Sequence, residues 1–210
     1  MHIAVRSTDQ QREEFEQKGY SSMVTIHWLS GHENINNVNA DACFDLAFND
    51  SDPAANKFLD QTIVFVNAVN STCTRIGRAN YVRINAWKGF LNRPVVEVAG
   101  VDDAYNQLAA ETLNALGWKY VWTADDYGFI SARIIAMIIN EAYYALEENV
   151  SSKEQIDIAL KLGTNYPYGP FEWSEKIGLE NIYQLLKNLS HQDKRYSIAQ
   201  TLVETFENRK

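Results

Sequence analysis

Cysteine is scarce in this sequence of 210 residues, which holds only Cys43 and Cys73 and no Cys-x-x-Cys pair. Two isolated cysteines do not make a disulfide framework. We therefore expect two reduced thiols in a cytoplasmic protein, with a disulfide between them as the less favoured alternative.

Positive charge and long apolar runs are lacking as well. Lys and Arg number 19 against 27 Asp and Glu, which gives a formal net charge of −8. A nucleic-acid-binding protein normally presents a basic face, so we expect no nucleic-acid partner. No stretch approaches the ~18 uncharged apolar residues of a membrane span. The first residues turn polar and acidic too early for a secretory signal, so we expect no membrane association.

The first part of the chain alternates between short apolar runs and helical patterns. Apolar residues make up 46% of the sequence and charged residues 22%, as in ordinary globular proteins. Helices are predicted over 10–18 and 102–116, each followed by a glycine stop. Strands alternating with helices predict an α/β sheet layered with helices. The predicted strands are 3–5, 24–29, 42–48, 62–69, 81–87, 95–98 and 119–122.

After Gly128 the pattern becomes entirely helical. Residues 129–149 are apolar around most of a helix circumference, which indicates burial on more than one side. The Ser-x-x-Glu pattern at 151–154 is typical of a capping box, and Pro170 suits the first position of another helix. Further helices are predicted over 179–189 and 193–207. We therefore predict two domains, 1–125 and 126–210, of class α/β plus all-α.

Several motifs in the second half occur in a specific order. They are Gly-Phe-Ile at 128–130, Lys-Leu-Gly at 161–163, Tyr-Pro-Tyr-Gly-Pro-Phe-Glu at 166–172 and Ile-Gly-Leu at 177–179. This order resembles the C-terminal helical domain of the 3-hydroxyacyl-CoA dehydrogenases over about 80 residues. The resemblance continues more weakly upstream, at Asn-Ser-Thr 70–72 and Val-Val-Glu-Val 95–98, and it implies a reduced Rossmann-like domain ahead of a helical dimerisation domain.

Members of the family bind NAD at a glycine-rich turn after the first strand, and the sequence of that turn is altered here. In the family, G-x-G-x-x-G lets the backbone approach the cofactor diphosphate at a helix N-terminus. The aligned positions hold Ser7, Asp9 and Arg12, and no two glycines of the chain lie two residues apart. The resemblance therefore predicts no ordinary NAD binding and no confident cofactor residue.

The family's catalytic residues are only partly retained. Its general-base histidine aligns with Asn85, which cannot take a proton at neutral pH. Its substrate-contacting asparagine aligns with Ala132. The carboxylate that orients the base is kept as Glu97, and a hydroxyl of the Asn-Thr-Ser motif is kept as Thr72. Read without the family, Glu97 is a strand-end carboxylate and Thr72 a turn hydroxyl.

Three functions stay open at this point. The leading one is a catalytically impaired relative, a pseudoenzyme that keeps a cleft for an acyl- or CoA-like ligand. The second is a divergent active NAD-dependent dehydrogenase, and the third is a structural or regulatory dimeric subunit. A homodimer through the helical half is expected because its first helix is so apolar. His27, His32 and Glu33 do not form a known ligand set, so no metal is expected.

Overall fold

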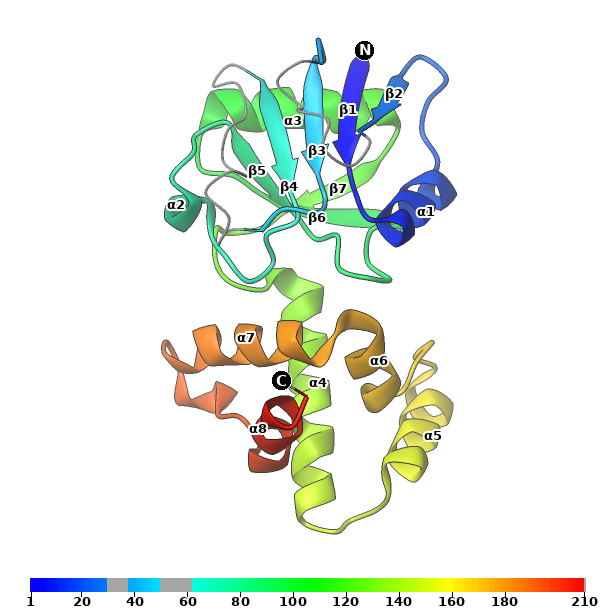
Figure 1. Cartoon of the computed structure of the whole chain (residues 1–210), viewed down its shortest axis with the longest axis vertical. Coiled ribbons are helices and arrows are strands. Elements are labelled where there is room, and N and C mark those ends of the chain that lie inside the picture. The colour runs from blue at the N-terminus through cyan, green and yellow to red at the C-terminus, as the bar shows by residue number, and fades with distance from the viewer. Residues whose placement is uncertain (30–37, 50–61, 210) are drawn as a thin grey trace. The chain divides into compact units, whose positions relative to one another are not determined.

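The computed structural model describes residues 1–29, 38–49 and 62–209 (Figure 1). It divides into two compact units, Met1–Phe129 and Ile130–Lys210. The division lies four residues beyond the boundary that we predicted after residue 125. The difference has a local cause, because Asp125, Asp126 and Phe129 all contact the buried Arg83 of the first unit.

The first unit is built on one seven-stranded sheet of order β2-β1-β3-β4-β5-β6-β7. All neighbouring strands are parallel except β5 and β6, which are antiparallel. The predicted strands are all present, but β3, β4 and β5 end earlier than expected. The strands are β1 (His2–Arg6), β2 (Thr25–Trp28), β3 (Ala42–Asp45), β4 (Ile63–Val66), β5 (Tyr81–Ile84), β6 (Val95–Ala99) and β7 (Lys119–Trp122).

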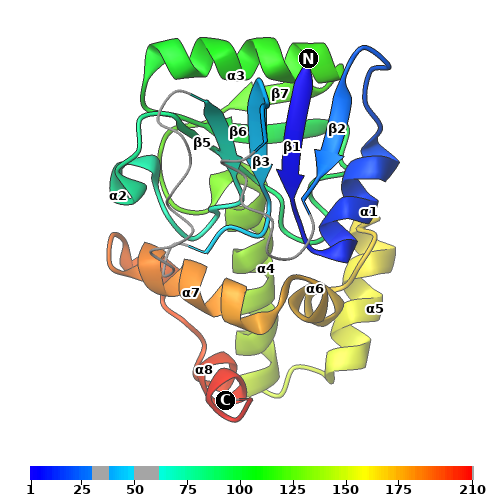
Figure 2. The same ribbon diagram turned by 45° about the horizontal axis from the view of Figure 1, so that its top comes forward.

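Alternating side chains of the strands form two apolar layers, one on each face of the sheet. Ile3, Val5 and Phe44 belong to the larger core cluster, whereas Ala4 and Cys43 belong to the smaller one. The larger cluster is covered by α1 (Asp9–Lys18) and α3 (Asp103–Leu116). The short helix α2 (Cys73–Ile76), which the sequence did not predict, contributes to the smaller cluster. In Figure 1 α3 runs behind the strands, and in Figure 2 it lies along the top of the sheet.

The second unit is helical, as the sequence predicted. Its helices are α4 (Phe129–Glu147), α5 (Lys153–Thr164), α6 (Pro170–Ile177), α7 (Leu179–Ser190), the short 3₁₀ helix η2 (Lys194–Tyr196) and α8 (Gln200–Glu207). Buried Ile135 and Ile139 of α4 and Leu185 of α7 belong to its core. The ring of Tyr183 stacks on Phe206 at 4.2 Å between centroids and joins α7 to α8.

Two sequence-based expectations for the second unit are corrected. The helix predicted over 193–207 is two elements, because Ser197 and Ala199 have extended backbone dihedral angles between η2 and α8. The cap of α5 is Ser152, whose hydroxyl accepts the backbone N–H of Gln155 at 3.4 Å, so the expected 151–154 capping box is absent.

Helix α4 is long and apolar enough to cross a membrane by length and composition alone. The core helix of a soluble protein passes the same test.

Candidate functional site

The carboxyl ends of β1 and β3 mark the point where the strand order of the sheet reverses. The chain leaves β1 for β2 on one side and returns to β3 on the other. In open α/β sheets, ligands bind in the crevice beyond this switch point. The residues that occupy this crevice therefore decide what the first unit can hold.

An ion pair joins the two strands across the switch point. Arg6 and Asp45 end β1 and β3 and stand opposite each other in the parallel register. The Arg6 Nε donates to Asp45 Oδ1 at 2.7 Å, and Nη2 donates to the other carboxylate oxygen. Asp45 is fully buried. Burial raises the pKa of Asp45, and the hydrogen bond and charge of Arg6 offset that rise only in part.

The N-terminus of α1 is closed by its own side chains. The Thr8 hydroxyl accepts the Gln11 backbone N–H at 3.3 Å, and Gln11 Oε1 accepts the Thr8 backbone N–H at 3.0 Å. Gln11 also donates through Nε2 to the Leu46 carbonyl at 2.6 Å, so its side chain reaches from α1 to the end of β3. A capping box thus uses backbone donors that a helix N-terminus otherwise offers to an anion.

The three residues aligned with the family's glycines lie around this same turn. Ser7 is half-buried between β1 and α1, and Asp9 is exposed at the first position of α1. Arg12 is exposed, pairs with Glu16 at 3.0 Å and lies 4.8 Å from the ring centroid of Trp28. Arg12 therefore lies along the α1 surface, in contact with Glu16 and Trp28 of the same unit.

Asn85 and Glu97 are brought together where the spacing of the family places its base and orienting acid. Asn85 follows β5 directly, and Glu97 lies within β6. Asn85 Nδ2 donates to Glu97 Oε2 at 2.9 Å, and its Oδ1 accepts the Trp87 backbone N–H at 3.4 Å. The exposed fractions are 2% for Asn85 and 9% for Glu97. The second bond fixes which end of the amide faces the carboxylate.

The other two family positions, Thr72 and Ala132, have structural roles. The Thr72 hydroxyl accepts the backbone N–H of Arg75 at 3.1 Å and so caps α2, as its reading as a turn hydroxyl predicted. Ala132 is fully buried in the first turns of α4, within the second unit. Neither residue offers an acid or a base.

A buried charge cluster beside α2 was missed by the sequence analysis. Arg83 has no exposed surface, and its Nη1 donates to Asp125 Oδ1 at 3.0 Å. Asp125 also accepts the backbone N–H groups of Cys73 at 2.7 Å and Thr74 at 3.0 Å. Burial raises the pKa of Asp125, but these N–H bonds and Arg83 lower it further, so the net pKa lies below its usual value. The available signal was an arginine inside an otherwise apolar strand.

In the second unit, one carboxylate contacts the end of the Tyr-Pro-Tyr-Gly-Pro-Phe-Glu motif. Asp157 of α5 accepts the backbone N–H of Phe171 at 2.8 Å and of Glu172 at 3.2 Å, which caps α6. Glu172 in turn accepts the Gly169 backbone N–H at 2.9 Å and pairs with Lys161. A Cβ on Gly169 would overlap the Asp157 side chain. The motif is therefore a corner between two helices.

Neither cysteine is paired, and no metal cluster is formed by the part of the chain that the structure describes. Cys43 and Cys73 are free and buried, and burial, with smaller contributions from nearby acids, raises the pKa of each thiol to about 12. No group of three His, Cys, Asp or Glu side chains gathers within residues 1–29, 38–49 and 62–209. His27 is exposed on β2, while His32 and Glu33 lie outside the described residues.

Comparison with known proteins shows which family the second unit resembles. Residues 128–210 match the family 3-hydroxyacyl-CoA dehydrogenase, C-terminal domain. The second unit is therefore a C-terminal domain of the 3-hydroxyacyl-CoA dehydrogenase family. It is 43% identical to a 3-hydroxyadipyl-CoA dehydrogenase of Escherichia coli over 42% of this chain and 19% of that protein. It is 36% identical to a 3-hydroxybutyryl-CoA dehydrogenase of Bradyrhizobium diazoefficiens over 50% of this chain and 37% of that protein. The chain thus spans less than two fifths of these two relatives.

Solved structures extend the likeness in fold to the first unit. An (S)-3-hydroxybutyryl-CoA dehydrogenase of Ralstonia eutropha matches with a TM-score of 0.72 and 16% identity, over 99% of this chain and 93% of that chain. M. tuberculosis FadB2 matches with a TM-score of 0.73 and 14% identity, over 98% and 93%. At this identity the match concerns the Rossmann-type sheet with its helical domain, not the chemistry.

Proposed function

We propose that this chain is a 3-hydroxyacyl-CoA dehydrogenase-like protein without ordinary dehydrogenase activity, which retains a cleft for an acyl- or CoA-like ligand. The observation that carries the proposal is the hydrogen bond from Asn85 to Glu97 at the place of the family's base. An amide has no titrating nitrogen, so it cannot take the proton of a 3-hydroxyl group at neutral pH. Loss of a positioned general base removes about 10²–10⁴-fold in rate.

The residues at the switch point also do not fit a dinucleotide. Arg6 and Asp45 span the crevice, and Gln11 joins α1 to the end of β3. The glycines that would admit a diphosphate are replaced by Ser7 and the charged Asp9 and Arg12. We therefore propose that NAD is not a cofactor of this chain.

An enzyme assay separates this proposal from the divergent active dehydrogenase. The wild-type protein is mixed with NADH and acetoacetyl-CoA, and NADH absorbance is followed. We expect no oxidation above background. NADH oxidation that is lost in Glu97→Gln and kept in the exposed control Glu111→Gln would establish the active alternative and overturn the proposal.

Ligand titrations separate the binding function from a purely structural one. Free CoA and acetoacetyl-CoA are titrated into the full chain, and the melting temperature is measured without NADH present. Saturable stabilisation by either compound supports a retained ligand cleft. No stabilisation by either would overturn that part of the proposal and favour a structural or regulatory subunit.

We also propose an oligomeric state and a location for the protein. A homodimer through the second unit would cover apolar residues that α5 leaves exposed, among them Ile158 and Leu162. A cytoplasmic location is consistent with two free, buried cysteines.

A further inference from the structure

A hollow of about 510 Å³ lies at the end of α1 opposite the altered glycine turn. It is lined by the last turn of α1, the loop before β6 and the turn between α3 and β7, all within the first unit. This volume is in the range of small-molecule sites, which measure about 300–1,000 Å³. Its position separates it from the switch point of the sheet.

Three cations line the hollow, and none of the described residues around it is acidic. Lys18, Arg93 and Lys119 come from three different segments of the chain. This is unusual for a protein in which acids outnumber bases by 27 to 19. A concave surface lined by one sign of charge concentrates the opposite ion.

The Lys18 ammonium is half-buried, and it pairs with no carboxylate of the described ranges 1–29, 38–49 and 62–209. It donates to the Arg93 carbonyl and lies 5.2 Å from the ring centroid of Trp118. Burial lowers the pKa of the Lys18 ammonium. Two of its three N–H donors remain for a ligand.

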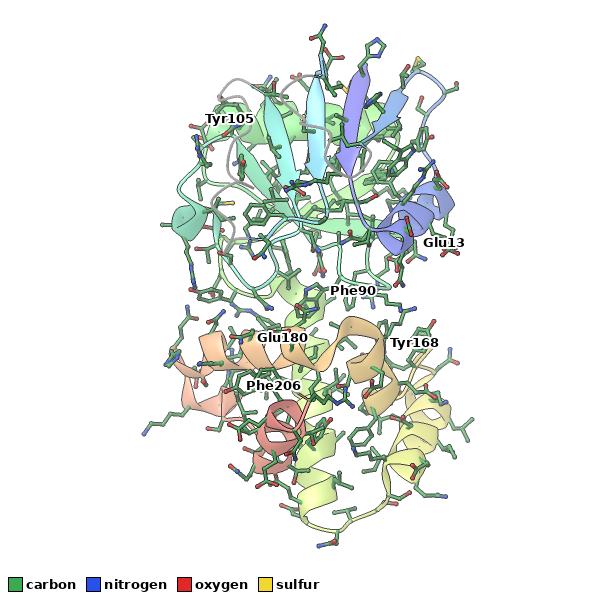
Figure 3. All side chains as sticks on the ribbon, in the orientation of Figure 1. Glu13, Phe90, Tyr105, Tyr168, Glu180 and Phe206 are labelled. Carbon is green, nitrogen blue, oxygen red and sulfur yellow. The ribbon has the colours of Figure 1, made fainter. Side chains whose placement is uncertain are left out.

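The other two cations complement Lys18. The Arg93 guanidinium lies 3.9 Å from the ring centroid of Phe90, and its Nε donates to the Gly89 carbonyl at 3.2 Å, so its orientation is fixed (Figure 3 labels Phe90). Lys119 is exposed and forms no ion pair with any described residue. A fixed guanidinium beside two ammonium groups is an arrangement that binds phosphate oxygens.

Helix ends are the simplest competing explanation for these cations. The hollow lies at the C-termini of α1 and α3, each equivalent to about half a negative charge. Those ends are already satisfied locally, because Gly19 and Gly117 donate to α1 and α3 carbonyls and Trp118 Nε1 donates to the Gly19 carbonyl at 2.7 Å. The full charges of Lys18 and Lys119 alone exceed two half charges, so a positive balance remains.

We propose that this hollow binds a phosphate-bearing small anion, held by Lys18, Arg93 and Lys119. The size of the hollow exceeds that of orthophosphate and suits a diphosphate group, free or as part of a nucleotide. The exposed Tyr20 lines the same hollow and adds a hydroxyl donor. The site is independent of any acyl or NAD chemistry.

Isothermal titration calorimetry of the full chain with sodium pyrophosphate tests the site. We expect one saturable site that weakens as salt is raised. Lys119→Gln should weaken binding about fivefold to tenfold, because one charge-assisted contact is lost. The matched control Lys194→Gln, an exposed lysine of the second unit, should bind as the wild type does.

A parallel titration with ATP identifies the source of the phosphate chemistry. Equal affinity for ATP and pyrophosphate supports a site for the diphosphate alone, and at least tenfold tighter ATP binding supports a nucleotide site. No saturable binding of either at millimolar concentration, or equal weakening by Lys119→Gln and Lys194→Gln, would overturn the proposal. Because NAD carries a diphosphate, any NAD binding is measured again in Lys119→Gln: binding lost there belongs to this hollow, and binding kept there belongs to the switch point.

Discussion

At the scale of single residues, the pair formed by Asn85 and Glu97 is the most informative contact in the first unit. Both side chains are buried, and the amide donates to the carboxylate across two neighbouring strands. A histidine in the same place would donate to the same carboxylate and still accept a proton at its other nitrogen. Asparagine preserves the hydrogen bond and removes the proton acceptor. Under the proposed function, the pair is kept for stability without that chemistry.

Replacing that amide by a second carboxylate gives a sharp test of the contact. In Asn85→Asp, two carboxylates would lie within about 3 Å, which strongly raises the pKa of one of them. A pKa raised on folding destabilises the folded state at pH values above the unfolded pKa. We therefore expect a loss of about 2–4 kcal/mol in the free energy of unfolding at pH 7.5. The loss should shrink as the pH falls toward about 4.

Urea unfolding at several pH values measures this effect. The matched control is Asn92→Asp, at an exposed position in the turn before β6. The control should stay within about 0.5 kcal/mol of the wild type throughout. If both variants unfold alike at pH 7.5, the Asn85–Glu97 contact is not the close pair described above.

The residue pairs also show where sequence reasoning succeeded and where it could not. The resemblance to the family aligned Asn85 with the base and Glu97 with its orienting acid, and the structure brings the two side chains together across the antiparallel strands β5 and β6. The pairing of Arg6 with Asp45 was not predicted, since the two lie 39 residues apart and meet only when β1 and β3 become neighbours. The Arg83–Asp125 cluster was missed for the same reason.

At the scale of secondary-structure elements, strands and helices followed local signals, and errors arose where local signals were weak. Gly19 and Gly117 have positive φ at the ends of α1 and α3, so their glycine stops were reliable. Helix α2 has only four residues and carries no periodicity that sequence reasoning can detect. The break between η2 and α8 has no glycine or proline to signal it.

The clamp formed by Asp125 predicts a pH dependence of stability. Its carboxylate joins α2, β5 and the end of the first unit through Cys73, Thr74 and Arg83. The pKa of Asp125 is lowered from 3.8 on folding, so its stabilisation is complete above that pH and is lost as the pH falls through the folded pKa. Asp125→Asn should therefore cost about 3–5 kcal/mol at pH 7 because it leaves buried Arg83 without its counter-ion.

Chemical unfolding of Asp125→Asn between pH 8 and pH 3 checks this prediction. The difference from wild type should be constant above pH 5 and narrow below about pH 4. The exposed Asp103→Asn serves as the control and should lose at most about 0.5 kcal/mol. A difference that persists undiminished to pH 3 would show that the charge of Asp125 is not what stabilises the clamp.

The corner between α5 and α6 makes a second prediction at this scale. In Gly169→Ala the new Cβ would overlap the Asp157 side chain, which caps α6 through Phe171 and Glu172. Asp157 is held by α5, so either the cap or the helix packing must shift. We expect a loss of about 1–3 kcal/mol in the free energy of unfolding.

A second glycine in α5 provides the control for that substitution. A Cβ on Gly163 would meet no atom within 4 Å. Gly163→Ala should therefore leave stability unchanged or raise it by up to about 1 kcal/mol, since alanine favours helix. Thermal unfolding of both variants gives the comparison. Equal melting temperatures for the two variants would mean that Asp157 does not require a glycine at position 169.

At the scale of the whole molecule, the two units differ in how firmly the comparisons identify them. The second unit is recognised from its sequence, and the first is matched in fold by structures only 14–16% identical over the whole chain. The corner at Asp157 explains this asymmetry in part, because its motif is structural and is constrained wherever these helices meet. Under the proposed function, the switch point of the first unit has no such constraint because it admits no dinucleotide. The proposal therefore accounts for the weaker likeness of the first unit.

The proposed homodimer is a property of the whole molecule, and α5 offers the clearest test of it. Ile158 is 46% exposed and Leu162 is 83% exposed, one helical turn apart on the same face. Under the proposal, these two apolar side chains lie in the interface between the two copies. If that partner is a second copy, the wild type should sediment at twice the chain mass. Ile158→Glu/Leu162→Glu should sediment as a monomer, because each new carboxylate would have to be desolvated in the interface. Met23→Glu, at an exposed apolar residue of the first unit, should remain a dimer. A wild type that sediments as a monomer at all concentrations would overturn the homodimer, and a double variant that still dimerises would place the interface elsewhere than α5.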